Sequence, residues 1–449
     1  MEKIAFVFPG QGSQYPRMGK QQYERHAIVR QIYEEASDLI GIDMRKLCFE
    51  SSNDELKQTH NAQPAIFTVS YAAFKVLTKE GLEPSFMAGH SLGEITALAC
   101  SGAIEFSDAI RLVRARGEIM QQVGEKSAGG MAAIKGLSLT EIQKICVEYS
   151  VNGNVACISN YNSNDQIVIS GSQEVLAQIK EDLNNNKSVK FTKLKVSAPF
   201  HSPLMQSAVE KFTQELKKYN YHDMKYPVIS DLTSQPYKNC DEIKGLSQHL
   251  VNPVMWKKTV DFLNKKEVKY IIEIGPNYVL RNLVKNCMSN IKAYSYDHLE
   301  DIPKISNLIE NFTGKEVLQN EHEQKLITIM QECIKQAIEI NHKSQVRLEP
   351  YDGEANTVVT LCLASAISTP NKNFDQIAYK TGVVESYKRI RKLQALLERE
   401  KRKPNDQEIT EALQLLYQIF KTKKLSYKEQ EMRFKMIIEQ LNKKKGYVL

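Results

Sequence analysis

The feature that most constrains the fold is a serine between two glycines in residues 86–94, which read FMAGHSLGE. The apolar residues before Gly89 are typical of a buried strand, and residues 94–100 favour a helix. A Gly-x-Ser-x-Gly sequence at such a junction is typical of a nucleophile elbow, a sharp turn that exposes the serine hydroxyl. Taken alone, the pattern is equally typical of a tight turn with an unreactive serine, so other residues must decide whether Ser91 is a nucleophile.

The composition is that of an ordinary globular protein, because 42% of the 449 residues are hydrophobic and 25% are charged. A chain of this length can form two or three domains with sizeable cores. It has no run of eighteen or more apolar residues and no signal-peptide pattern, so we expect a cytoplasmic protein without membrane contact. The eight cysteines include no Cys-x-x-Cys pair, and neither a zinc site nor a disulfide framework is expected.

The positive charge is concentrated in the last third of the chain. Residues 1–310 contain 36 Lys and Arg against 35 Asp and Glu, a net charge of +1, whereas residues 311–449 contain 24 against 18, a net charge of +6. Basic runs lie at 389–392, 401–403 and 443–445. Such runs are typical of solvated helix faces, and they could also meet an acidic partner.

The first part of the chain has the pattern of an α/β protein. Residues 4–8 form an apolar strand, and the glycine-containing loop PGQGSQ follows at 9–14. In α/β enzymes such a loop at the carboxyl end of a strand lies near the active site. Helices are predicted over most of 15–80, at 94–101 and at 108–123.

The pattern changes after residue 130, where short apolar and alternating segments predict the order β-α-β-β-α-β. The strands are predicted at 131–135, 155–160, 166–170 and 188–195, and the helices at 140–148 and 173–184. This order is that of the ferredoxin-like motif. We therefore expect a small ferredoxin-like subdomain at about 127–197, inserted into a larger α/β-hydrolase-like subdomain, with a ligand cleft between the two.

Two further residues are candidates for the site. His201 lies in the sequence PFHS at 199–202, where the chain leaves the insert, and it is a candidate base for Ser91, although a single histidine is more often structural. Arg116 lies in the helix predicted at 108–123, where an arginine is most often exposed to solvent.

Six motifs together resemble the malonyl-coenzyme A:acyl carrier protein transacylases, a family that extends to the acyltransferase components of polyketide synthases. They occur in the same order and at about the same spacing. The motifs are FPGQGSQ at 8–14, GHSLGE at 89–94, RG at 116–117, FHS at 200–202, NPV at 252–254 and EIGP at 273–276. The resemblance covers residues 1–310, which it implies to be the acyltransferase domain.

The resemblance implies a role for each matched position. Ser91 would take the acyl group as an ester, and His201 would act as general base and then as general acid. The backbone N–H groups of Gln11 and Leu92 would form the oxyanion hole. A main-chain carbonyl, which falls at Met255, would orient the histidine, so that no aspartate is needed. Many relatives have glutamine where this chain has Met255.

The resemblance also implies the substrate. Arg116 would pair with the malonyl carboxylate and exclude acetyl groups, which would leave a buried cation unpaired. Phe200 would crowd an α-methyl group, which disfavours methylmalonyl by about 1–3 kcal/mol. The implied reaction is ping-pong transfer of malonyl from malonyl-coenzyme A to the phosphopantetheine thiol of an acyl carrier protein, without a metal or redox cofactor, in fatty acid or polyketide synthesis. An acyl carrier protein hydrolase and a non-catalytic scaffold that acts through its tail are the alternatives.

Residues 318–449 predict a separate all-α domain, a bundle of four or five helices after a linker near 311–321. Apolar residues recur every three or four positions, and the uninterrupted apolar segment 357–368 is expected to be buried. Asn405 and Ser426 are expected helix caps. The bundle is interpreted either as a docking module for a polyketide synthase or as a stabilising or dimerising appendage. Few aromatic side chains accompany its charges, which disfavours nucleic-acid binding.

Overall fold

The chain divides into two units, Met1–Gly314 and Lys315–Leu449. The boundary falls between residues 310 and 318, where the sequence places the end of one domain and the start of the next. The computed structural model describes residues 2–151, 153–184, 186, 188–194, 196, 198–313, 318–345, 358–370, 379–423, 425 and 427–443.

A five-stranded parallel sheet forms the centre of the first unit, with the strand order β7-β2-β1-β8-β9. Its strands are β1 (Lys3–Phe8), β2 (Phe86–Gly89), β7 (Val228–Ile229), β8 (Val268–Glu273) and β9 (Lys292–Ser295). Phe8 pairs with Gly89 in parallel register, so the last residues of β1 and β2 lie side by side. The loops that follow the parallel strands therefore meet at one edge of the sheet.

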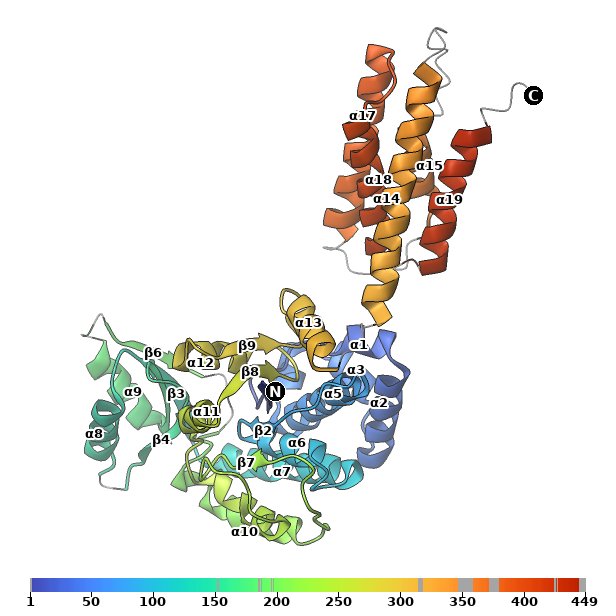
Figure 1. Cartoon of the computed structure of the whole chain (residues 1–449). Helices are drawn as coiled ribbons and strands as arrows, with labels where there is room; N and C mark the ends of the chain where they lie inside the picture. The colour runs from blue at the N-terminus through green and yellow to red at the C-terminus, as the bar shows by residue number, and fades with distance from the viewer. Residues whose placement is uncertain are drawn as a thin grey trace. The chain divides into compact units, whose positions relative to one another are not determined.

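Thirteen α-helices of the first unit are described, together with two 3₁₀ helices. They are α1 (Lys20–Arg25), α2 (Ala27–Ile40), α3 (Met44–Phe49), α4 (Asn53–Lys57), α5 (Thr59–Lys79), α6 (Leu92–Cys100), α7 (Phe106–Lys126), α8 (Leu139–Tyr149), α9 (Gln173–Leu183), α10 (Gln206–Leu216), α11 (Trp256–Lys265), α12 (Val279–Cys287), α13 (Ile302–Thr313), η1 (Pro203–Met205) and η2 (Cys240–Leu250). Figure 1 shows their arrangement.

Both faces of the parallel sheet are buried, which explains the uninterrupted apolar sequence of β1. Phe6 and Phe8 lie on one face, with their ring centroids 6.3 and 6.4 Å from that of Phe74 in α5. Ala5 and Val7 point to the other face and belong to the hydrophobic cluster that α11 and α12 complete. The strand thus buries alternate residues against opposite helical layers.

The insert forms a second, antiparallel sheet with the order β4-β5-β3-β6. Its strands are β3 (Gly129–Lys135), β4 (Ala156–Tyr161), β5 (Gln166–Ser172) and β6 (Lys190–Lys193). Helices α8 and α9 cover one face and share a hydrophobic core with the strands (Figure 1). The predicted ferredoxin-like order is confirmed. Among the described residues, β6 is shorter than the segment 188–195 that the sequence predicts.

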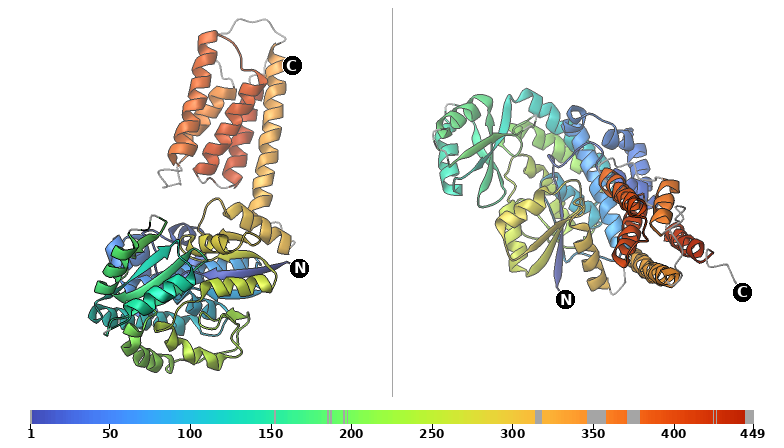
Figure 2. Two further views of the ribbon diagram at one scale, coloured as in Figure 1. Left: turned by 90° about the vertical axis from the view of Figure 1, so that its left-hand side faces the viewer. Right: turned by 90° about the horizontal axis from the view of Figure 1, so that it is seen from above.

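The second unit is helical wherever its elements are described. It contains α14 (Leu318–Gln345), α15 (Val358–Ser368), the π-helical turn η3 (Lys380–Val384), α17 (Glu385–Glu400), α18 (Asp406–Thr422) and α19 (Tyr427–Lys443). Figure 2 shows its long helices running side by side. The predicted linker at 311–321 is wrong at both ends, because α13 extends to Thr313 and α14 begins at Leu318.

A predicted cap and a predicted buried segment can be located in the second unit. Asn405 caps α18 by accepting a hydrogen bond from the N–H of Glu408, and the Glu408 side chain bonds back to form a capping box. The predicted caps include Ser426, which lies outside the described residues, as does the first residue of the segment 357–368. Five of the 11 residues of α15 are buried, whereas Ala364, Ile367 and Ser368 are exposed, so the expected burial holds for one face of the helix only.

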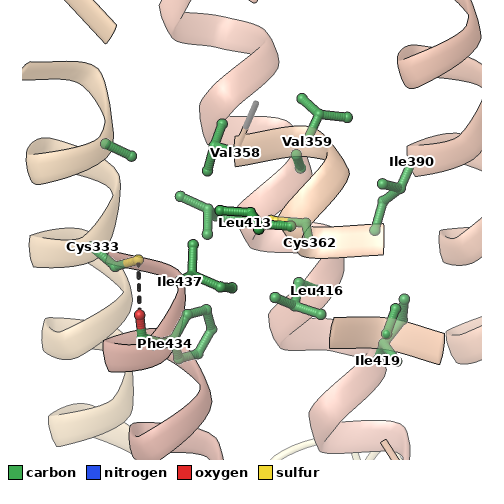
Figure 3. Close-up of a cluster of buried hydrophobic side chains, with 14 of the residues drawn as sticks. Cys333, Val358, Val359, Cys362, Ile390, Leu413, Leu416, Ile419, Phe434 and Ile437 are labelled. Carbon is green, nitrogen blue, oxygen red and sulfur yellow. Dashed lines mark hydrogen bonds between the residues drawn. The ribbon is translucent and has the colours of Figure 1, made fainter. Parts of the chain in front are cut away.

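The bundle has its own hydrophobic core (Figure 3). Val359 and Cys362 of α15 lie beside Leu413 of α18, and all three side chains are fully buried. The Sγ atom of Cys333 in α14 lies 3.9 Å from the carbonyl oxygen of Phe434 in α19.

In the part of the chain that the structure describes, every helix is too short or too polar to cross a lipid bilayer.

Candidate active site

Ser91 lies in the turn between β2 and α6, as the elbow pattern predicts. Its φ of 55° and ψ of −104° are rare for a residue with a side chain. A Cβ on Gly89 would lie 1.8 Å from the carbonyl carbon of Gly93, and a Cβ on Gly93 would lie 1.9 Å from the carbonyl oxygen of Phe8. Both glycines are therefore required, because backbone fills the space that a side chain would need.

The hydroxyl of Ser91 meets the imidazole of His201, with 2.8 Å between Oγ and Nε2. The Nδ1 atom of His201 lies 2.6 Å from the carbonyl oxygen of His249 and 3.2 Å from that of Asn252. Carbonyl oxygens only accept hydrogen bonds, so Nδ1 carries the proton and donates it. The lone pair of Nε2 consequently faces the hydroxyl of Ser91, which is the arrangement of a base and its nucleophile.

The carbonyl that orients the histidine is not that of Met255, and this expectation is wrong. The Met255 carbonyl caps the start of α11, where it accepts from the N–H of Thr259 at 3.1 Å. It also lies 3.4 Å from Oγ of Ser234. The carbonyls of His249 and Asn252, three to six residues earlier, are the ones that reach His201.

His201 is uncharged in this environment. The side chain is buried, and burial together with the nearby Arg116 cation lowers the pKa of His201 to about 3. The hydrogen bonds to the His249 and Asn252 carbonyls oppose this shift of the pKa, but they are the weaker effect. The imidazole is therefore neutral at pH 7 and available to accept a proton.

Arg116 is buried beside the nucleophile and is only 2% exposed, in contrast to the usual position of an arginine on a helix. Its Nη2 donates to Oγ of Ser91 at 3.1 Å, and its Nη1 donates to Oε1 of Gln63 in α5 at 2.9 Å. A Cβ on Gly117 would lie 2.9 Å from Cα of His60, so this glycine lets α7 approach α5 closely enough for the contact with Gln63. Burial lowers the pKa of Arg116 to about 10, so the guanidinium stays charged at neutral pH.

The loop after β1 packs directly against the elbow. A Cβ on Gly10 would lie 2.5 Å from the carbonyl oxygen of His90, and the N–H of His90 donates to the Phe8 carbonyl at 3.0 Å. Gln11 follows in this loop, and its side chain donates to Thr59 at 3.2 Å. Leu92 is the first residue of α6, where a helix leaves backbone N–H groups without an intrahelical partner.

Phe200 directly precedes His201 and is buried. Its carbonyl accepts a hydrogen bond of 2.6 Å from Oγ of Ser170 in β5. A second link joins the insert to the elbow, because Nε2 of His90 lies 3.0 Å from Oδ1 of Asn162. The small subdomain thus contacts the residue that directly precedes each member of the dyad formed by Ser91 and His201.

Three buried residues next to the dyad have no role in the sequence analysis, although one of them, Glu94, ends the GHSLGE motif. The carboxylate of Asp231 accepts a hydrogen bond from the N–H of Ser91, and the carboxylate of Glu94 accepts one from the N–H of Asp231 at 2.9 Å. The Nε2 atom of His249 lies 3.1 Å from Glu94. Asp231 follows β7 at the same sheet edge as Ser91, which is the signal that could have indicated it.

Glu94, Asp231 and His249 have side chains of the kinds that bind metal ions. One possible ligand atom from each lies within 4.8 Å of the others, and this is the one such group among the described residues. Glu94 and Asp231 already accept backbone hydrogen bonds. Burial raises the pKa of both carboxyl groups, and the charge of Asp231 raises the pKa of Glu94 further. Hydrogen bonds to the protein backbone thus account for Glu94 and Asp231, and His249 lies against Glu94 without a hydrogen bond from Nε2.

The family follows from a comparison with known proteins. Residues 5–328 match the family model for the acyl transferase domain. The chain belongs to the acyl transferase family. The match covers nearly all of the first unit, including the parallel sheet and the insert, and extends into the first residues of α14 in the second unit.

Individual relatives of this acyl transferase carry a more specific name. Malonyl CoA-acyl carrier protein transacylase of Bacillus subtilis is 39% identical over 312 residues, which are 69% of this chain and 78% of the relative. The transacylase of Escherichia coli K12 is 37% identical over 295 residues, 65% of this chain and 95% of the relative.

Solved structures agree with the sequence relatives. The malonyl CoA-acyl carrier protein transacylase of Coxiella burnetii superposes with a TM-score of 0.65 at 34% identity and covers 68% of this chain and 96% of its own. A malonyl-transacylase in complex with a type II PKS acyl-carrier protein also has a TM-score of 0.65 at 34% identity, and it covers 69% of this chain and 99% of its own.

Proposed function

We propose that this acyl transferase moves a malonyl group from malonyl-coenzyme A to the phosphopantetheine thiol of an acyl carrier protein through an ester on Ser91. The observation that carries the proposal is the buried cation of Arg116 beside the nucleophile. A free carboxylate on the acyl group would satisfy this cation, and an uncharged acyl group would not. The names of the relatives agree with this substrate class.

In the first half-reaction, Oγ of Ser91 attacks the thioester carbonyl while Nε2 of His201 takes the hydroxyl proton. The carbonyl oxygen becomes negatively charged, and the N–H groups of Gln11 and Leu92 would stabilise it. The C–S bond then breaks, and His201 returns its proton to the sulfur of coenzyme A. The product is malonyl-Ser91.

The second half-reaction reverses these steps with a different thiol. His201 removes the proton of the carrier protein's phosphopantetheine thiol, and the sulfur attacks the ester carbonyl of malonyl-Ser91. The C–O bond breaks, and His201 returns the proton to Oγ. The exchange changes no oxidation state and each proton passes through His201, so we propose that the reaction needs no metal or redox cofactor.

Two residues would set the acyl specificity. Arg116 would select malonyl over acetyl by pairing with the second carboxylate. Phe200, next to His201, would crowd an α-methyl group, and a single methyl changes binding in an apolar pocket by about 1–3 kcal/mol. Selection against acetyl should therefore be stronger than selection against methylmalonyl.

Intact-protein mass spectrometry tests the proposal. The full-length protein is mixed with malonyl-, methylmalonyl- or acetyl-coenzyme A, and holo acyl carrier protein is added afterwards, with Ser91→Ala as the control. We expect a malonyl adduct that requires Ser91 and then moves to the carrier protein. Loss of the adduct to water instead would identify an acyl hydrolase, and no adduct with any substrate would favour a non-catalytic scaffold.

We also propose that the helical unit docks on an acidic surface of the carrier protein or of a polyketide synthase that carries it. The support for this proposal is the charge of the unit, because residues 311–449 have a net charge of +6 and α17 exposes Arg391 and Lys392. The neighbouring Lys388 is also exposed and pairs with Glu385 of the same helix at 3.1 Å. Attraction between complementary charges speeds association and weakens as salt is added.

A charge-reversal experiment separates docking from a stabilising appendage. The pair Arg391→Glu and Lys392→Glu is compared with Lys211→Glu in α10 and Lys217→Glu at its C-terminal cap, an equal charge change on exposed positions. Docking predicts that only the α17 pair slows transfer to the carrier protein at low salt, and that added salt removes the difference. Equal rates for both pairs would favour the appendage.

A further inference from the structure

We propose that Glu94 is a positioning residue that links both members of the dyad. Through Asp231 it holds the backbone of Ser91, and through the imidazole of His249 it holds the carbonyl that orients His201. The inference rests on the proposed roles of Ser91 and His201.

The first link runs from Glu94 to the nucleophile. Glu94 is 0% exposed and lies three residues after Ser91, in the first turn of α6. Its Oε2 accepts the N–H of Asp231 at 2.9 Å, and the carboxylate of Asp231 accepts the N–H of Ser91. A backbone acceptor at this position opposes relaxation of Ser91 from its positive φ, since relaxation would break the hydrogen bond.

The second link runs from the same oxygen to the base. Oε2 of Glu94 lies 3.1 Å from Nε2 of His249, whose side chain is 3% exposed. The contact is a close approach of two buried polar groups and not a hydrogen bond, since Nε2 has no hydrogen-bond partner among the described residues. The carbonyl of His249 lies 2.6 Å from Nδ1 of His201. Ring and carbonyl belong to one residue near the end of η2, so anchoring the ring restricts the movement of the carbonyl.

The other oxygen of Glu94 provides a matched control. Oε1 accepts a hydrogen bond from the hydroxyl of Tyr237, and this bond belongs to neither of the two links. Removing this hydroxyl disturbs the same buried carboxylate but leaves both links intact. The change Tyr237→Phe therefore measures the effect of losing a hydrogen bond to Glu94 that takes no part in either link.

The experiment uses the full-length protein and two readouts. The first is the second-order rate constant for labelling of Ser91 by phenylmethylsulfonyl fluoride, a neutral reagent that does not need the Arg116 cation. The second is the separation of kcat from KM for malonyl-coenzyme A. The variants are His249→Ala, His249→Gln, Glu94→Gln and Tyr237→Phe, and circular dichroism confirms that each is folded.

We expect His249→Ala and Glu94→Gln to lower the labelling rate constant by about 10- to 100-fold, the scale of a misplaced catalytic group. In His249→Ala, kcat should fall with KM changed by less than about 2-fold, because Arg116 and Gln63 are untouched. His249→Gln can donate an N–H to Glu94 and should recover most of the rate. Tyr237→Phe should be labelled within about 2-fold of wild type.

Labelling of His249→Ala at the wild-type rate would overturn the inference, as would an equal loss in Tyr237→Phe. If His249→Ala does not fold, the comparison of Glu94→Gln with Tyr237→Phe decides in the same way. A wild-type protein that is labelled but transfers no malonyl would contradict the proposed function and leave this inference standing. A wild-type Ser91 that is not labelled would overturn both.

Discussion

The Nη2 atom of Arg116 lies 3.1 Å from the Oγ atom of Ser91, so the nucleophile and a buried positive charge share one small volume. The other terminal nitrogen of the guanidinium, Nη1, donates a hydrogen bond of 2.9 Å to Oε1 of Gln63. An acyl group on Ser91 that carries its own carboxylate could therefore fold back onto the guanidinium. This relationship makes the choice of acyl group an electrostatic one.

Replacing the arginine should change the preferred substrate. In Arg116→Ala, the rate constant for malonylation of Ser91 should fall by a factor corresponding to about 2–5 kcal/mol, the usual effect of removing one partner of a buried charge pair. Acetylation should change much less. The measurement is the rate of adduct formation by mass spectrometry. Arg111→Ala, on an exposed position of the same helix, should react as wild type does. Equal losses for malonyl and acetyl would contradict the assignment.

Acid should destabilise the first unit partly through His201. Because its pKa is about 3 in the folded protein and near 6.5 when unfolded, the unfolded state binds an extra proton between these values, so stability falls as the pH falls through this window. From pH 6 to pH 5, the free energy of unfolding of wild type should decrease by about 1 kcal/mol more than that of His201→Asn.

The single tryptophan makes this measurement specific to the first unit. Trp256 is the only tryptophan of the chain and is fully buried in α11. Its fluorescence during urea denaturation at several pH values reports unfolding around the parallel sheet. Parallel stability curves for wild type and His201→Asn would show that His201 does not titrate differently in the two states.

The elbow should tolerate no side chain at Gly89. A Cβ there would collide with backbone at 1.8 Å, so Gly89→Ala should either prevent folding or displace Ser91 enough to abolish its acylation. Gly245→Ala is the control, because a Cβ at Gly245 would meet nothing within 4 Å. Soluble yield and Ser91 labelling give the readout. An active Gly89→Ala protein would mean that the turn can open.

Shortening a core side chain of the helical bundle should destabilise the second unit without slowing the acylation of Ser91. Leu413 is fully buried in the bundle core, and Leu413→Ala should cost about 2–5 kcal/mol in the second unit. Circular dichroism should show earlier loss of helix on heating, whereas Trp256 fluorescence and Ser91 malonylation should not change. Gln414→Ala, at an exposed position, is the control. Slower malonylation in Leu413→Ala would show that the bundle supports the catalytic unit.

Features encoded by neighbouring residues could be predicted from the sequence. The turn around Ser91 follows from two glycines with no room for a side chain, and the ferredoxin-like order follows from short alternating segments. The helix start at Asn405 follows from a capping box within four residues. Arg116 required the family resemblance, because its helix alone gives no sign of burial.

Features that depend on tertiary packing could not be predicted. Which carbonyl reaches His201 depends on how η2 ends, and the structure has His249 and Asn252 where the family resemblance implied Met255. Glu94 ends the GHSLGE motif but has no role implied there, Asp231 lies in no motif, and only the parallel sheet brings the two together. The prediction of a linker at 311–321 is wrong at both ends because the polar residues there belong in part to the end of α13 and the start of α14.

The backbone of the dyad has a consequence for engineering. Ser91 and His201 have φ values of 55° and 56°, in the left-handed region that glycine adopts readily and that residues with a side chain adopt only at a cost in free energy. At both positions the backbone conformation would therefore be less strained with glycine, which lacks the reactive side chain. A search for thermostable variants that ignores activity should drift toward losing the dyad, so any such selection must require turnover at every round.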